Sequence, residues 1–228
     1  MKYAKYIIPA LAIMLAASCD MDKKANGQDD NTSQQQAPKE YKSPEEAATA
    51  AKEDMLAAID KVNFGVSRDA LKNATPGAPV MKYGIDWDAL VRADSNITPE
   101  NMTQPEPVTM VPLINGTDVV TMVALNNRNQ QYTVAALGDK QIAEELDMVR
   151  KADSAGMQSE IKIFEVPNLQ AVVYAVGSPS GNIYYTSYNN NSIRRGMNGA
   201  ELFKMLKNDA VLFQRQFGEE LKKGKLVK

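Results

Sequence analysis

Apolar positions recur at helical spacing in three stretches of this chain. The first begins with SPEE at 43–46, which is typical of a helix N-terminus: Ser accepts a backbone N–H, Pro fits the first helical position, and Glu completes a capping box. Apolar residues rich in alanine then fall on one face, which predicts a helix over about 43–62. Two further helices are predicted, from Gly138-Asp139 to about 152 and over about 199–217.

Between these helices the pattern changes to strands. Val108–Ile114 and Asp118–Leu125 are β-branched runs that flank Asn115-Gly116, a strong hairpin signal, and a turn at 126–129 leads to a third strand over 130–137. Four more segments have strand character: 80–86, 160–166, 170–176 and 182–188. Strands joined by short turns, with helices between them, predict one α+β domain over 43–228. We expect a mostly antiparallel sheet of about five to six strands with three main helices.

The first 19 residues follow a different pattern. Lys2 and Lys5 precede an apolar run over 7–17, and the run ends at Ser18-Cys19. A basic start, a short apolar core and a small-residue cleavage site predict a secretory signal. The apolar run is well short of the ~20 residues needed to cross a bilayer, so a transmembrane anchor is a poor alternative.

This N-terminus resembles a bacterial lipoprotein signal peptide, in which a cysteine is linked to diacylglycerol and the chain is cut before it. The resemblance implies a signal peptide over 1–18 and a lipidated Cys19 with palmitate-type acyl chains as the membrane anchor. Two or three acyl chains are enough for stable anchoring. Cys19 is the only cysteine of the chain, so it has no disulfide partner within the chain. The alternative is an ordinary export signal followed by an unrelated cysteine.

Residues 19–42 are polar, rich in amides and low in complexity, which predicts a flexible tether. Asp20 and Asp22 resemble the acidic flanks of surface-exported lipoproteins of the Bacteroidota, although a solvated leader has the same composition. The expected location is therefore the cell envelope, with the chain lipid-anchored in the outer membrane on either its periplasmic or its surface face.

Composition narrows the possible functions. The chain has 26 basic and 28 acidic side chains, and loss of residues 1–18 would leave a net charge of −4, which argues against a nucleic-acid partner. Histidine is absent, which excludes Ser-His-Asp hydrolysis and His-ligated metal sites. We expect no cofactor, no metal and no catalytic residue.

The best candidate for a binding surface lies in NIYYTSYNNNSIRR at 182–195. Strand alternation places Tyr184, Thr186 and Tyr188 on one face, and amide and guanidinium groups follow directly. Aromatic faces beside such donors hold sugars or peptide backbones. The candidate binding residues are Tyr184, Tyr188, Asn189, Asn190, Arg194 and Arg195. The simpler interpretation is a half-exposed strand that runs into a polar loop.

Two weaker motifs complete the candidates. Asp86-Trp87-Asp88 pairs carboxylates with an aromatic ring, but residues two apart diverge on helix and strand, so Trp87 is better interpreted as a core anchor. Asp153-Ser154-Ala155 resembles the O-glycosylation acceptor of Bacteroidota envelope proteins, which makes Ser154 a possible modification site. The acidic run at 144–147 is interpreted as the wet face of its helix.

Three function classes fit these observations. The first is an anchored envelope lipoprotein whose domain binds or scaffolds an envelope protein or a glycan without catalysis. The second is a peptide or protease regulator that takes an extended peptide as an added strand. The third is a glycoside hydrolase that works with carboxylates alone, and it requires two acids facing each other across a cleft.

Overall fold

The computed structural model describes residues 38–94, 98–153 and 159–222 of the chain. These residues fall within the second of two units into which the chain divides, Met1–Gln36 and Ala37–Lys228. The predicted signal peptide, Cys19, most of the predicted tether and Ser154 lie outside the described residues.

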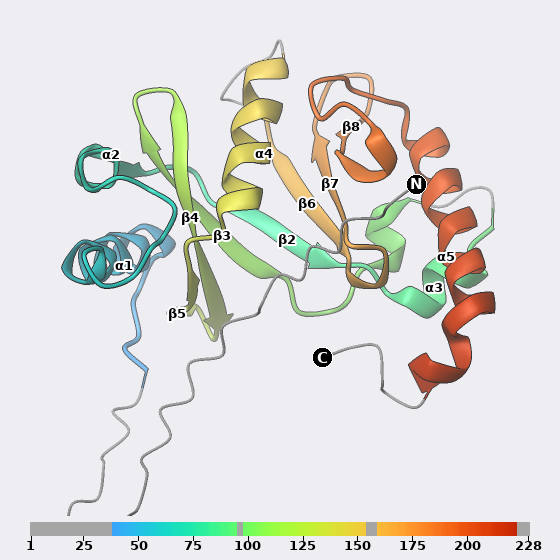
Figure 1. Cartoon of the computed structure of the whole chain (residues 1–228), viewed down its shortest axis with the longest axis horizontal. Coiled ribbons are helices and arrows are strands. Elements are labelled where there is room, and N and C mark those ends of the chain that lie inside the picture. Colours follow the sequence, from blue (N-terminus) through green and yellow to red (C-terminus); the bar gives the residue numbers. More distant parts are fainter. Residues whose placement is uncertain (1–37, 95–97, 154–158, 223–228) are drawn as a thin grey trace, which may run out of the picture. The chain divides into compact units, whose positions relative to one another are not determined.

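Eight strands form one mixed sheet in the order β5-β4-β3-β2-β6-β7-β8, with β1 paired to β3 (Figure 1). Their bounds are β1 Thr75–Pro76, β2 Val80–Gly84, β3 Val108–Asn115, β4 Asp118–Arg128, β5 Gln131–Leu137, β6 Ile161–Val166, β7 Ala171–Val176 and β8 Ile183–Tyr185. Of these strand pairs only β2–β6 is parallel. The predicted α+β class and mostly antiparallel sheet are confirmed in outline, but five to six strands is an undercount.

The described chain contains five α-helices, of which three are substantial. These three are α1 Pro44–Ala58, α4 Lys140–Ala152 and α5 Gly199–Lys222, and the short ones are α2 Arg68–Asn73 and α3 Trp87–Arg92. The cap predicted for α1 is present, because the Glu46 N–H donates to Ser43 Oγ at 3.1 Å. Asp139 caps α4 in the same way, accepting from the Ile142 N–H at 3.1 Å.

The second hairpin turns later than the sequence pattern predicts. The β4 strand continues to Arg128, and the turn is made by Asn129 and Gln130, whose φ angles are 53° and 64°. Two positive φ values in a two-residue loop match the right-handed twist of the paired strands. The turn is therefore tighter than the predicted one at 126–129.

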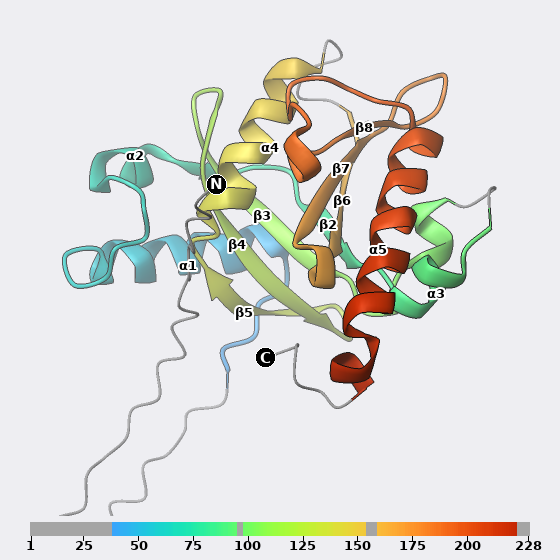
Figure 2. The same ribbon diagram turned by 45° about the vertical axis from the view of Figure 1, so that its right-hand side comes forward.

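Helices cover both faces of the sheet (Figures 1 and 2). Because neighbouring residues of a strand point to opposite faces, Ile163 of β6 packs with α4 while Phe164 packs with α5. In β3, Met110 likewise faces α4 and Val111 faces α1. Helix α4 thus covers the centre of one face. On the other face, α1 and α2 cover the β3–β5 half, and α3 and α5 cover the β6–β8 half.

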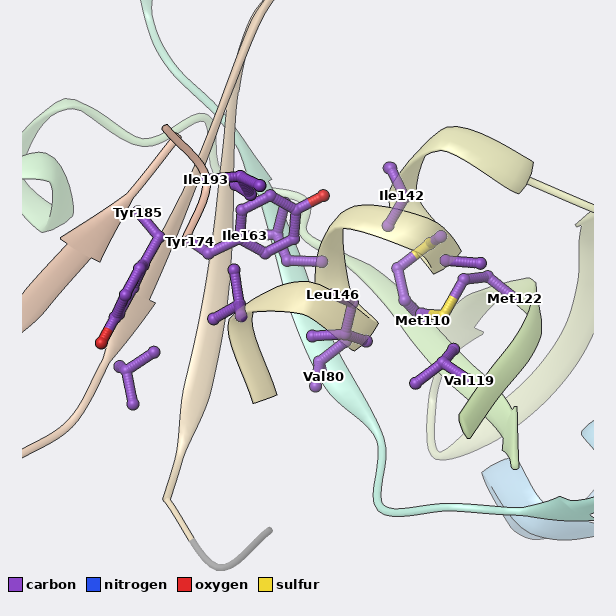
Figure 3. Close-up of a cluster of buried hydrophobic side chains, with 13 residues drawn as sticks. Val80, Met110, Val119, Met122, Ile142, Leu146, Ile163, Tyr174, Tyr185 and Ile193 are labelled. Carbon is purple, nitrogen blue, oxygen red and sulfur yellow. The ribbon is translucent and has the colours of Figure 1, made fainter. Parts of the chain in front are cut away.

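The core under α4 joins the two halves of the sheet. Figure 3 shows Leu146 of α4 between Met110 and Met122 on one side and Tyr174 on the other. Each of these four side chains is at most 1% exposed. Burial of this kind stabilises the fold by roughly 1.5–3 kcal/mol for each large apolar side chain.

Candidate functional site

Tyr184 and Tyr188, the two tyrosines among the candidate binding residues, face helix α5. Tyr184 is 7% exposed and meets Phe203 edge-on, with ring centroids 5.4 Å apart. Tyr188 follows the end of β8, is half-buried, and its hydroxyl donates to Asp209 Oδ2 at 2.9 Å. Burial and the Asp209 carboxylate raise the pKa of the Tyr188 phenol to about 12. These rings are used to pack α5 on the sheet, so their faces are not open to a ligand.

The polar candidates, Asn189, Asn190, Arg194 and Arg195, are exposed, but they do not form a single surface together with the two tyrosine rings. Asn189 and Asn190 are exposed in a short turn with φ of 54° and 60°, and Asn189 Nδ2 lies 3.6 Å from Met205 Sδ of α5. Arg194 is exposed on the other side of β8 and lines a hollow of about 440 Å³ beside the last turn of α4. Arg195 is exposed next to it.

The segment wraps around the end strand of the sheet. Ile193 is buried in the core under α4, whereas Tyr188 packs with the core under α5. Of the six candidates, the structure therefore leaves Asn189, Asn190, Arg194 and Arg195 open to solvent, divided between two sides of β8. A role of these four residues in binding stays a prediction.

Asp86-Trp87-Asp88 forms the start of α3. Asp86 is the helix cap and accepts from the Ala89 N–H at 2.7 Å, while exposed Asp88 lies 3.9 Å from Arg92. Trp87 packs edge-on to Phe213 at 5.5 Å, and its indole N–H donates to Gln214 Oε1 at 2.7 Å. The motif therefore caps a helix and anchors it to α5.

The carboxylate of Glu145 in α4 accepts hydrogen bonds from three side chains. Its Oε1 accepts hydrogen bonds from Ser187 Oγ at 2.7 Å and Gln141 Nε2 at 3.3 Å, and its Oε2 accepts one from the Tyr174 hydroxyl at 3.0 Å. Glu145 is 8% exposed and Tyr174 is fully buried. Burial, and next the Glu145 charge, raise the pKa of Tyr174 well above its usual value. The carboxylate joins α4 to β7 and to the segment after β8.

Sequence reasoning missed Glu145. The acidic run at 144–147 was interpreted as a wet face, which is wrong for Glu145 because that side chain is buried. A signal was present: Ile142, Leu146 and Val149 define the apolar stripe of the helix, and position 145 falls on that same stripe. An acidic residue on an apolar stripe predicts a buried, hydrogen-bonded carboxylate.

A mostly apolar hollow lies between α3 and α5 and was not predicted. It measures about 410 Å³, and Leu90, Met102 and Phe203 form its apolar wall. Lys204 and Lys207 of α5 stand at the same hollow, and the Lys207 ammonium donates to the Ala93 carbonyl. Asp94, the last described residue before the gap at 95–97, also lines the hollow.

The described ranges, 38–94, 98–153 and 159–222, lack two features that bear on function. Within them, no group of three or more Asp, Glu, His or Cys side chains is arranged to hold a metal ion. Within the same ranges, no helix has both the length and the apolar character that crossing a bilayer requires. Comparison of the chain with protein-family models, with curated proteins and with solved structures finds no match in any of the three.

Proposed function

We propose that this protein is a lipid-anchored lipoprotein of the bacterial envelope whose α+β domain binds a protein partner without catalysis. The observation that carries the anchor is the pattern of residues 1–19: two lysines, a short apolar run, and the chain's only cysteine at its end. Acylation of Cys19 by palmitate-type chains would hold the domain at the membrane surface, and the outer membrane is the proposed location.

The polar chemistry of the described domain supports binding rather than catalysis. Three acids are engaged in the fold: Glu145 accepts hydrogen bonds from two hydroxyls, Asp86 caps α3, and Glu165 pairs with Lys82 at 2.8 Å. A glycoside hydrolase needs two carboxyl groups that face each other across a cleft. These three carboxylates cap a helix or bond to side chains of neighbouring elements, which favours a non-catalytic domain.

The placement of the aromatic rings favours a protein partner over a glycan. Sugars are usually held against open aromatic faces. Tyr184 and Tyr185 are buried, and Tyr188 is half-buried and hydrogen-bonded to α5. The exposed Asn190, Arg194 and Arg195 offer polar contacts of the kind found at the rims of protein interfaces.

A peptide or protease regulator is the second candidate, and one observation favours it. Strand β5 lies at an end of the sheet and pairs with β4 alone among the named strands. An end strand with free main-chain groups can accept an extended peptide as an added strand.

Fatty-acid labelling tests the anchor. Cells are fed an alkyne analogue of palmitate, and the wild-type chain is compared with Cys19→Ser. We expect the wild type to carry the label and to sediment with membranes, and Cys19→Ser to carry no label. An unlabelled wild-type chain would contradict the proposed anchor.

Crosslinking in cells tests the binding function. A photoreactive residue placed at Arg195 or Asn190 in the full chain should capture one abundant envelope protein, and the same residue at exposed Ala57 of α1 serves as the control. Capture from neither of the two test positions, together with a soluble domain that retains envelope glycans on a column, would replace the protein partner by a glycan.

A further inference from the structure

The two ends of the sheet differ in how they are closed. At the β8 end, the Tyr184 N–H donates to the Met197 carbonyl at 3.2 Å, and the Met197 N–H donates back to the Tyr184 carbonyl at 2.8 Å. The three-residue strand is thus covered by the chain that follows it, and buried Ile193 holds that cover in place. The main-chain groups of a strand that is paired in this way are not free to bond to an added strand.

The β5 end is also closed by a single residue pair, but β5 is seven residues long. Tyr41 and Tyr132 exchange two main-chain hydrogen bonds, each 2.9 Å long. Residues 38–40, just before Tyr41, are exposed and form no strand, so the chain leaves the ladder there. The segment before α1 therefore covers Tyr132 and nothing further along β5.

The position of Val134 follows from the ladder. In an antiparallel pair, residues that bond to the neighbouring strand alternate with residues whose N–H and C=O point away. The main-chain N–H and C=O of Tyr132 point away from β4, because they bond to Tyr41. Val134 lies two residues later in β5, opposite Leu125. Its N–H and C=O therefore point outward as well, and no described group forms a hydrogen bond to them.

The composition of β5 does not protect this edge. Natural proteins guard edge strands with charged residues, proline, bulges or a covering segment. The sequence of β5, QYTVAAL, contains no charged residue and no proline, and Ala135 and Ala136 are exposed. The register shift opposite Ala124 and Leu125 is the one protective irregularity along the β4–β5 pair.

Apolar side chains lie along the edge on the α1 side. Tyr132, Val134 and Leu137 are half-buried and pack with the core under α1. Beyond the end of β5, the loop after α1 lines a hollow of about 270 Å³, where Val62 is 40% exposed. Phe64 of this loop adjoins Gly138, which directly follows β5. One row of side chains of an added strand would therefore meet apolar surface.

We infer that the β5 edge accepts an extended, uncharged segment of a partner protein as an additional strand, with Val134 as the central pairing residue. The inference rests on the proposed binding function in the form of its second candidate, and it names the kind of segment that the β5 edge takes. A second copy fits less well: two-fold pairing of β5 about Val134 would put Ala136 of that copy opposite Tyr132, where Tyr41 already lies.

A synthetic peptide tests the edge. The probe is an acetylated, fluorescently labelled seven-residue peptide of alternating threonine and valine, and its control is the same peptide with every second amide nitrogen methylated. The full-length lipoprotein in detergent should bind the first and bind the second at least tenfold more weakly. Absence of binding to the unmethylated peptide at millimolar concentration overturns the proposal.

Variants of β5 locate the binding site. Val134→Pro removes an N–H that donates to no described group, and Ala136→Glu adds a charge at an exposed position; each should weaken binding of the unmethylated peptide at least tenfold. The matched control is Ala57→Glu, at an exposed alanine of α1, and it should bind like the wild type. Far-ultraviolet circular dichroism, which follows all helices and strands, checks that each variant is folded. Wild-type affinity of both β5 variants overturns the proposal.

Hydrogen exchange identifies any occupant already present. The Val134 amide should exchange fast in the free protein and slowly with peptide bound. Slow exchange without peptide overturns the proposal in favour of this chain's own segment or, if light scattering gives a dimer, a second copy. In cells, a photoreactive residue at exposed Ala135 of β5 should capture a partner, and Val134→Pro should abolish that capture. Capture at Arg195 or Asn190 that Val134→Pro does not change, with no capture at Ala135, leaves the binding function standing and overturns the β5 assignment.

Discussion

At the scale of single residues, Glu145 shows how a charged side chain is kept inside the domain. Its carboxylate accepts hydrogen bonds from Tyr174, Ser187 and Gln141, so the three donors and the charge satisfy one another. Removal of the carboxylate leaves a buried tyrosine hydroxyl without its acceptor, and an unpaired buried polar group costs about 1–3 kcal/mol. This cost lowers the free energy of unfolding, because the hydrogen bonds of Glu145 connect α4 to β7 and to the segment after β8.

We therefore expect Glu145→Ala to lower the free energy of unfolding by about 2–3 kcal/mol. Glu144→Ala, one position away on the same helix but exposed, should change it by less than about 0.5 kcal/mol. Urea unfolding followed by circular dichroism measures both. Equal effects of the two variants would mean that the hydrogen bonds of Glu145 contribute nothing beyond helix propensity.

Tyr188 gives the domain a dependence on alkaline pH. Burial and Asp209 raise the pKa of its phenol from an ordinary 10.0 to about 12 in the folded state. The folded protein therefore keeps the phenol proton where the unfolded chain has lost it. The resulting stabilisation is fully present below pH 10 and is lost as the pH rises toward 12.

We expect the unfolding free energy of the wild type to fall between pH 10 and 12, and to fall less steeply in Tyr188→Phe, which has no proton to lose at that position. The difference between the two proteins should shrink across this range. Urea titrations at pH 9, 10, 11 and 12 measure it, and parallel curves would show that Tyr188 ionises as it does in the unfolded chain.

At the scale of elements, an aromatic contact packs α5 against α3. The ring of Phe213 in α5 meets Trp87 of α3 edge-on, with ring centroids 5.5 Å apart. Phe213 also packs against the tilted ring of Phe217, with centroids 4.9 Å apart. The neighbouring Leu212 is 60% exposed. Trp87 is the chain's single tryptophan, so its emission reports on this contact alone.

We expect Phe213→Ala to lower the unfolding free energy by about 2 kcal/mol, less than the ~3–5 kcal/mol of a fully buried Phe because Phe213 is half-buried. The emission of Trp87 should shift to longer wavelength as water reaches the ring. Leu212→Ala, at the adjacent exposed position, should leave both quantities unchanged. A red shift in both variants would indicate a general loosening of α5.

Sequence patterns predicted the elements better than their ends. Capping residues such as Ser43 and Asp139 placed the helix starts correctly, because they act through local hydrogen bonds. The strand predicted over 182–188 stops at Tyr185, since the Thr186 hydroxyl accepts from the Tyr188 N–H and so bends the backbone out of the ladder. Beyond Tyr185 the backbone leaves the extended conformation, with Ser187 at φ −92° and ψ −5°.

The candidate site was harder to predict than the fold. Alternation correctly put Tyr184 and Tyr188 on one face, but residue types do not reveal that α5, which begins at Gly199, covers that face. The parallel β2–β6 pair joins segments about 80 residues apart, and no local pattern indicates it. Long-range pairing also decides which strands end the sheet, so the open β5 edge is visible only in the structure.

At the scale of the whole described domain, the sheet consists of two half-sheets that meet at the β2–β6 pair. One half is β5-β4-β3-β2 with α1 and α2, and the other is β6-β7-β8 with α3 and α5. Four residue pairs of β2–β6 connect them directly. The core under α4 also spans both halves, and Leu146, fully buried at its centre, contacts side chains from each (Figure 3).

Because Leu146 belongs to both halves, its truncation should destabilise the domain as one unit. We expect Leu146→Ala to lower the unfolding free energy by about 2–5 kcal/mol, against less than about 0.5 kcal/mol for Leu212→Ala on the exposed side of α5. Trp87 fluorescence follows the α3–α5 half, and far-ultraviolet circular dichroism follows all helices and strands. The two signals should give one coincident transition in urea, as expected of a cooperative unit. Separate transitions in the variant would show that the half-sheets fold independently and that α4 joins them only loosely.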